Sequence, residues 1–372
     1  MNKINFSDNI FASGRNLYLQ TSTLEGEEKM VSTLFDGGRV LEKASVFFDP
    51  ALSEERLYHQ VEAFHQERKQ ALEFIFSISA RVKTVRHPRS LVKLAGQFLK
   101  WNLIDEAISE LEFALQYDKN IADIYILLAS AYEKRGVPEE SVRTLQNAVT
   151  IFPKYADLWK DLSEKQSVLG KWDSAEESIE KALKINPNYS DAHLIKSFLL
   201  SRKQEVLKSG TKSENQSAER LQRHLNRLVQ SEKFRSAELD NAVRFCHNEE
   251  WQSLTKQLEF MIRNIPKTID FDFHDLFYLQ YLYGEQGKNA KSINDYVSRL
   301  ESFIQKFPKF ADLHNMLGIG YLIQCRLLFS KALHQFRIAC KLNPDYERAK
   351  SNLKLAENDG KGFLILLRAM LK

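Results

Sequence analysis

Small and large apolar residues recur every 34 residues between residues 88 and 189. Large residues occupy two positions of the period: Leu91, Tyr125 and Trp159, then Leu94, Leu128 and Leu162. Small residues occupy three more: Ala95, Ala129 and Ser163, then Ala107, Ser141 and Ala175, then Ala114, Ala148 and Ala182. Pro153 and Pro187 end their units, because proline cannot continue a helix. Small residues let two helices approach closely, so each unit is predicted to be an antiparallel helix pair.

This pattern resembles the tetratricopeptide repeat (TPR) family at its diagnostic positions, over three units without a gap. The resemblance implies a mostly α fold, a TPR-type α-solenoid of antiparallel helix pairs, expected over 87–201. A partial fourth unit begins at Ser190, where Lys196 stands at a position expected to hold a buried leucine. We predict no second helix in register for that unit.

A second, degenerate TPR-like array is predicted over 236–358. Its last unit contains Leu317, Gly318, Ala332, Phe336 and Ala339, and it is two residues longer than the period, which predicts one expanded turn. Between the arrays, 202–235 holds nine Lys or Arg against four Glu, a local charge of +5. We interpret this segment as a basic irregular linker and helix, either an irregular unit or an elbow.

The N-terminal block has a different period. Residues 15–48 alternate apolar and polar positions around the turn residues Asp36-Gly37-Gly38, which predicts a three-stranded antiparallel β-meander within 1–50. Residues 51–86 carry an apolar stripe and are predicted to form a helix that covers the meander. The stretch from Ala44 to Phe48 is the more apolar edge, which leaves a homodimer through this block open.

The C-terminal segment 359–372 is predicted to be an apolar helix, FLILLRAMLK from Phe363, after a flexible DGKG. It either caps the last repeat or docks on another molecule. No stretch reaches 18 apolar residues, so we expect no membrane span. The first residues show no secretory signal, and three cysteines, an odd and sparse count without a CxxC pair, fit a reducing compartment, so we expect a cytoplasmic protein. The N-terminal block resembles that of bacterial TPR proteins, which implies a bacterial protein.

Sequence motifs for catalysis are weak. Gly37-Gly38 lacks the spacing and the lysine of a phosphate loop, and no HExxH or Gly-x-Ser-x-Gly motif is present. We interpret His59 and His65 as solvent-facing, and His193 and His314 as packing residues at the large position of their repeats. The sequence therefore predicts a non-enzymatic protein without cofactor or metal.

The TPR resemblance also implies a partner site. The first helix of each pair lines a concave groove in this family, and the matching positions here are Val92, Leu99, Asp123, Ile126, Ser130, Glu133, Lys160, Glu164, Leu194 and Phe198. Val92 and Gly96 replace the Lys and Asn that clamp a carboxylate in some TPR proteins, so we do not expect such a clamp. The groove instead suits an amphipathic protein or peptide segment, unless the chain fills it itself.

We therefore predict a scaffold for protein–protein interactions. The alternative is a nucleic-acid or anionic-surface adaptor that uses the basic segment 202–235. A net charge of +4 and the lack of aromatic residues among the basic ones argue against nucleic acid.

Overall fold

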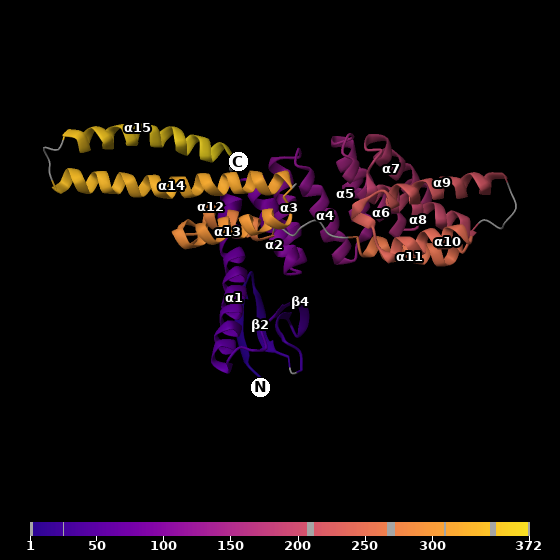
Figure 1. Ribbon diagram of the computed structural model, residues 1–372, viewed down its shortest axis with the longest axis horizontal. Coiled ribbons are helices and arrows are strands. Elements are labelled where there is room, and N and C mark those ends of the chain that lie inside the picture. Colours follow the sequence, from indigo (N-terminus) through magenta and orange to yellow (C-terminus); the bar gives the residue numbers. More distant parts are fainter. Residues whose placement is uncertain are drawn as a thin grey trace. The chain divides into compact units, whose positions relative to one another are not determined.

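A four-stranded antiparallel sheet opens the chain, and helices make up nearly all of the remaining described residues (Figure 1). The structure is a computed structural model that describes residues 3–24, 26–206, 212–265, 272–308, 310–342 and 347–370. The chain divides into two units: unit 1 (Met1–Gln97 and Phe271–Lys372) and unit 2 (Phe98–Asp270). Unit 1 is therefore built from two distant stretches of sequence.

The sheet has one strand more than the meander that we predicted. Its strands lie in the order of the sequence: β1 (Asn5–Ala12), β2 (Arg15–Thr23), β3 (Lys29–Asp36) and β4 (Arg39–Phe47). The missed strand, β1, joins β2 through Ser13 and Gly14, which both have positive φ. This is the geometry of a two-residue hairpin turn. The sequence signal was weak because half of the strand's eight residues are polar and they do not alternate strictly with the apolar ones.

Strand β4 is an edge strand with exposed apolar side chains, Val46 at 41% and Phe47 at 70% exposure. The Phe48 N–H donates to Glu28 O at 3.1 Å, toward β3. Backbone groups alternate in direction along an antiparallel strand, so the N–H groups of Ser45 and Phe47 point away from β3. The homodimer through this edge stays a prediction.

Helix α1 (Glu54–Val85) packs on β1, β2 and β3. His65 on this helix is 1% exposed, so our interpretation of it as solvent-facing was wrong. Its ring nitrogens lie 2.9 Å from Thr21 Oγ1 on β2 and 2.9 Å from Asp8 Oδ2 on β1, and Lys69 Nζ lies 2.8 Å from Asp8 Oδ1. The polar strand residues thus hold the helix to the sheet. His59 points to solvent and lies 3.5 Å from Glu62.

Helix α12 (Asp272–Tyr283) returns the chain to unit 1 after unit 2 is complete. Arg81 on α1 donates to the backbone oxygen of Tyr283 at 2.8 Å. The Tyr283 hydroxyl donates to Ser90 Oγ, on α2 (Pro88–Lys100), at 2.9 Å. Two further helices stack beyond α12: α13 (Ala290–Lys306) and α14 (Ala311–Leu342). The last helix, α15 (Glu347–Met370), packs against α14.

Two C-terminal predictions were wrong. Helix α14 runs without a break for 32 residues, where we predicted a helical hairpin with an expanded turn. Helix α15 runs through Gly360 and Gly362, where we predicted a flexible joint. Whether the end of the chain caps the repeat or docks elsewhere depends on side chains outside the described set.

Helix α14 also bears on the expectation of no membrane span. It is the one helix, among the described residues, that is long and apolar enough to cross a membrane by length and composition. Its length and composition alone do not place it in a membrane, so the expectation of no membrane span stays a prediction.

Unit 2 is an array of antiparallel helix pairs in the predicted repeat register. Its helices are α3 (Ile104–Tyr117), α4 (Ala122–Arg135), α5 (Pro138–Ile151), α6 (Ala156–Val168), α7 (Trp172–Ile185), α8 (Ser190–Val206), α9 (Lys212–Val229), α10 (Ala237–His247) and α11 (Trp251–Arg263). The recurring small residues of the second helices have no exposed surface: Ala107, Ala114, Ser141, Ala148, Ala175 and Ala182. The TPR-type solenoid fold is confirmed.

A hydrogen bond recurs at the start of successive units. The side chain at the large first position contacts a backbone oxygen six residues earlier: Tyr125 with Lys119 at 3.2 Å, Trp159 with Pro153 at 3.0 Å and His193 with Pro187 at 2.9 Å. His193 is buried, as we predicted for a packing residue. The bond holds the start of each first helix against the end of the preceding unit. It therefore helps to determine which residues of successive units face each other.

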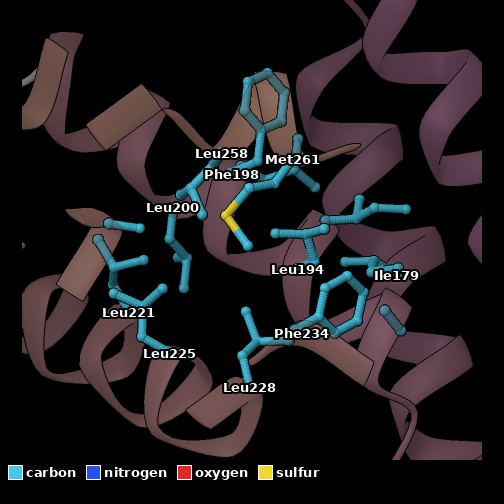
Figure 2. Packing of buried hydrophobic residues seen from close by; sticks show 14 of the residues in the cluster. Ile179, Leu194, Phe198, Leu200, Leu221, Leu225, Leu228, Phe234, Leu258 and Met261 are labelled. Carbon is cyan, nitrogen blue, oxygen red and sulfur yellow. The ribbon is translucent and has the colours of Figure 1, made fainter. Parts of the chain in front are cut away.

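The helix that we predicted in the basic segment, α9, pairs with α8 as the second helix of the fourth unit, as the irregular-unit alternative requires. Helix α9 packs on α8, and its residues Leu221, Leu225 and Leu228 are buried in the core of unit 2 (Figure 2). Lys196 on α8 is buried at the leucine position, with its ammonium 2.8 Å from Glu176 and 2.7 Å from Glu180 on α7. Two carboxylates thus compensate a charge inside the array.

Candidate functional site

A groove of about 590 Å³ opens on unit 2 between helices that are distant in sequence. The lining comes from α4, α6, α8 and α11, from Gly170 in the turn between α6 and α7, and from Trp172 at the start of α7. We call the apolar pair Val168 and Trp172 the base, and the helices α4, α6 and α11 around it the walls. The lining residues are Glu133, Glu164, Ser167, Val168, Gly170, Trp172, Ile195, Phe198, Arg202, Glu259, Ile262 and Arg263.

Helix α11 forms one wall of the groove because it packs directly on α8. Leu258 and Met261 of α11 belong to the same buried cluster as Leu194 and Phe198 of α8 (Figure 2). Thr255 Oγ1 on α11 lies 3.1 Å from Ser201 Oγ on α8. The chain therefore fills by itself the part of the concave face that α8 would otherwise present.

The base of the groove is apolar and partly exposed. Val168, the last residue of α6, is 63% exposed, and Trp172, the first residue of α7, is 38% exposed. Gly170 lies between them with a φ of +71°, which permits the tight turn that brings both side chains to the groove. The Trp172 and Phe198 rings lie 6.4 Å apart. Exposed apolar surface of this kind is what a binding partner can cover.

Charged residues of both signs surround this base. Lys165 Nζ lies 2.8 Å from Glu133 Oε2 and 3.3 Å from Glu164 Oε1. Burial lowers the pKa of Lys165, but the two carboxylates outweigh this and raise the pKa overall, so the ion pairs persist at neutral pH. On α11, Arg263 lies 2.5 Å from Glu259.

Arg202 stacks over the Trp172 ring, with its guanidinium carbon 4.3 Å from the ring centre. The same two side chains also line a smaller hollow of about 220 Å³ with Asp173, Glu176, Leu199 and Lys203. A cation over an indole face is a stabilising contact that also fixes the orientation of the ring. Arg202 therefore holds Trp172 in place at the groove.

Three of the ten predicted partner residues line this groove: Glu133, Glu164 and Phe198. Asp123, Ile126 and Ser130 on α4 and Lys160 on α6 are at least partly exposed but lie outside the lining. Val92, Leu99 and Leu194 are at most 8% exposed and lie outside the lining, so their place in a partner site stays a prediction. Leu194 is covered because α9 and α11 pack around α8.

Sequence reasoning missed most of the lining, including Val168, Trp172, Arg202, Ile262 and Arg263. We carried over only positions in the first helix of each pair, whereas Trp172 begins a second helix. The residues of α11 had no usable signal, because nothing in their local pattern shows that they pack on a helix some 60 residues earlier.

Two clusters of polar side chains outside the groove could in principle take part in catalysis, but both are largely buried. Thr21, His65 and Asp8 form a hydroxyl–imidazole–carboxylate chain, but Thr21 has no exposed surface and cannot meet a substrate. Hydrogen bonds from Lys69 and His65 lower the pKa of Asp8, so it stays ionised. The His193 and His224 rings meet at 2.7 Å between their Nδ1 atoms, and burial lowers the pKa of His224 to about 4. No cluster of three or more potential metal ligands occurs among the described residues.

Comparisons with known proteins find no matching family model and no matching curated protein. Solved structures do match. A crystal structure of MamA is 20% identical and covers 44% of this chain and 94% of its own, with a TM-score of 0.37. The structure of YrrB, "a TPR protein with an unusual peptide-binding site", is 15% identical over 55% of this chain and 97% of its own (TM-score 0.36).

A tetratricopeptide repeat protein from Parabacteroides merdae ATCC 43184 is 17% identical and covers 73% of this chain and 98% of its own, with a TM-score of 0.36. YrrB and the Parabacteroides protein are described as TPR proteins. The repeat register of unit 2, with its buried small residues and its recurring hydrogen bond, shows the same fold independently of them.

Proposed function

We propose that this protein is a non-enzymatic scaffold and that the groove of unit 2 binds a short amphipathic segment of a partner protein. The observation that carries the proposal is the apolar base at Val168 and Trp172, set between acidic and basic side chains. A groove of about 590 Å³ is within the usual size range of ligand sites, roughly 300–1,000 Å³.

The charges suggest which segment would fit. Glu133 and Glu164 share one lysine, Lys165, so their side of the groove keeps a net negative charge. Arg202 provides a positive charge where it stacks on Trp172. A partner segment with an apolar anchor for the Trp172 face and a basic residue for the α4–α6 wall would match both. This peptide specificity rests on the groove alone.

Replacing Val168 with aspartate tests the site. We expect peptides selected from a displayed random library on the wild-type protein to bind the variant at least tenfold more weakly, since a carboxylate would lie against their apolar anchor. Dissociation constants can be measured by isothermal titration calorimetry. Val137→Asp is the matched control, because Val137 is 36% exposed on the same unit but lies outside the groove lining. Equal weakening by both variants, or by neither, would contradict the proposed site.

The adaptor alternative has one observation in its favour. Arg220, Arg223 and Arg227 are exposed on one face of α9 while the leucines between them are buried. A row of arginines on a helix can contact phosphate groups. A helix that packs on one side needs polar residues on its solvent-facing side, and this alone accounts for the three arginines. We therefore rank this function second.

Charge reversal separates the two functions. We expect the triple variant Arg220→Glu, Arg223→Glu, Arg227→Glu to elute from heparin at the same salt concentration as Lys154→Glu, Lys184→Glu, Lys256→Glu, because both sets change the net charge equally. The three lysines are exposed on the same unit. Loss of retention in the arginine variant only, with a steep salt dependence, would favour the anionic partner.

A further inference from the structure

Helix α14 contains the sequence of both helices of a repeat but folds as one. Leu317, Gly318 and Tyr321 stand at positions of a first helix, and Ala332, Phe336 and Ala339 at positions of a second. In the complete units of unit 2 the chain turns between these two sets. In α14 it continues straight from Ala311 to Leu342.

The first half of α14 occupies its place in the stack. His314 Nε2 lies 2.9 Å from Pro308 O, the same contact that His193 makes with Pro187. Tyr321 donates to Glu301 on α13 at 2.7 Å, as Tyr132 donates to Glu112 on the preceding helix at 2.9 Å. Gly320 lies against α13, where an added Cβ would come within 3.0 Å of Val297. This half is a first helix packed on the unit before it.

The second half does not reach its usual partner. In the third unit, Ser163 at the small position of the first helix donates to the Ala175 backbone oxygen of the second helix at 2.7 Å, and both residues are buried. Their counterparts here, Gly318 and Ala332, are exposed. A Cβ at Gly318 would meet no atom of the described chain within 4 Å. Helix α15 packs against α14 but leaves both of these positions exposed.

The helix stays straight for a local reason. The turns after α4 and α6 contain Gly136 and Gly170 at positive φ, whereas no glycine or proline occurs between Tyr321 and Leu342. Helix propensity therefore favours continuation, and Leu328, in the middle of this stretch, is left 63% exposed. Gly318 and Ala332 are 14 residues apart, about 21 Å along a straight helix, so they cannot meet within one chain in this form.

We propose that this last repeat is completed between two copies of the chain, in which the second half of each α14 packs on the first half of the other. Two α14 helices laid antiparallel place Gly318 of each copy opposite Ala332 of its partner. This reproduces the antiparallel contact that α6 and α7 make within one unit. At 100° per residue, Gly318, Tyr321, Leu328 and Ala332 lie within one 100° sector of the helix, so one straight face serves both contacts. The interface is two-fold symmetric and closed.

The two-fold symmetry also places Cys325 at the centre of the proposed interface. Cys325 is seven residues from Gly318 and seven from Ala332, and it lies in the same sector of the helix. It is an exposed, free thiol. The two Cys325 residues of a dimer would therefore face each other across the two-fold axis. A disulfide there requires a Cα separation of about 4.4–6.8 Å. Gly318 and Ala332, two helical turns to either side, favour a close approach of the two backbones, and Tyr321 and Leu328 would pack beside the axis.

Oxidation of single-cysteine forms of the full chain tests this arrangement. We expect the form that keeps only Cys325, with Cys246→Ser and Cys340→Ser, to give a disulfide-linked dimer of twice the monomer mass. The form that keeps only Cys340, on the same helix but off this face, is the matched control and should stay monomeric on a non-reducing gel. Light scattering at micromolar concentration should show a dimer for the reduced wild type.

Mixing two different cysteine variants distinguishes a repeat that is completed between two copies from a hairpin that closes within one copy. In a cysteine-free background, co-refolded Gly318→Cys and Ala332→Cys chains with tags of different size should form a mixed disulfide. A disulfide between both positions of a doubly substituted single chain would show a closed hairpin and overturn the proposal. Binding of a monomer to phosphatidylcholine–phosphatidylglycerol vesicles would assign the face to a membrane and also overturn it.

The exposed edge strand β4 is the other surface through which two copies could form a dimer. Ser45→Pro blocks an outward N–H of β4 and should leave both the dimer and the Cys325 cross-link intact. A monomeric Ser45→Pro protein without the cross-link would place the dimer contact at the sheet and overturn the proposal for α14. A monomeric wild type would overturn both.

Discussion

Replacing Leu258 with alanine is expected to destabilise unit 2 by about 2–5 kcal/mol, because the side chain has no exposed surface in the core that joins α11 to α8. Truncation leaves a cavity that the surrounding helices cannot fully close. Hydrogen–deuterium exchange in peptides of α8 and α11 measures this locally, since a chain of two units has no single free energy of unfolding. The same variant should bind groove peptides more weakly, because α11 forms a wall of the groove.

Phe260→Ala is the control for this experiment. Phe260 is two residues away on α11 and 53% exposed, so its truncation should change the exchange free energies by no more than about 0.5 kcal/mol. Equal protection of α8 in wild type and Leu258→Ala would mean that α11 does not pack on α8, and the groove would then lose one wall.

Removing both partners of Lys196 is expected to cost about 3 kcal/mol. The double variant Glu176→Ala, Glu180→Ala leaves an ammonium group, whose side chain is 4% exposed, inside the array without a carboxylate. Thermal unfolding and exchange of α7 and α8 amides measure the loss. Adding Lys196→Leu to the double variant should restore most of the stability, because it removes the uncompensated charge and provides the apolar side chain that the repeat usually has there.

The pH dependence of stability offers a second readout for these carboxylates. Burial raises the pKa of Glu176, but the hydrogen bond and charge of Lys196 outweigh burial and lower it below the ordinary value of 4.5. A carboxyl with a lowered folded pKa stabilises the fold above its unfolded pKa, and that stabilisation is lost as the pH falls through the folded pKa. Wild type should therefore lose stability below about pH 4.5 more steeply than the triple variant. The control is Glu139→Ala, which removes an exposed carboxylate on α5 of the same unit and should leave the pH profile nearly unchanged. Failure of Lys196→Leu to rescue the double variant would contradict the role given to the ion pairs.

The repeat architecture was predictable because its determinants are local. Ala107, Ser141 and Ala175 recur at one spacing and are buried alike, since each lies between two helices that are adjacent in sequence. The hairpins of the sheet were also predictable where turn residues such as Gly37 and Gly38 mark them. Strand β1 was missed because its buried polar partner, His65, belongs to a helix more than 50 residues away.

The candidate site, in contrast, was decided by tertiary structure. Glu133 and Glu164 could be placed at the groove from their repeat positions, but Leu194 was expected to be exposed and is buried. The difference comes from α11, which packs on α8 through Leu258 and Met261. A sequence shows that these residues are apolar, but not which distant surface they cover.

By itself, the sequence determined the period, the helix pairs of the regular units and the small residues between them, because these depend on contacts within about 34 residues. Only the tertiary structure decided that α9 and α11 close around α8, that α12 returns to α1 and that α14 stays straight. The packing around α8 and the return of α12 to α1 both result from apolar side chains that are buried against helices far away in the sequence. The third results from a missing helix breaker, which left the chain one continuous helix where its repeat pattern calls for two.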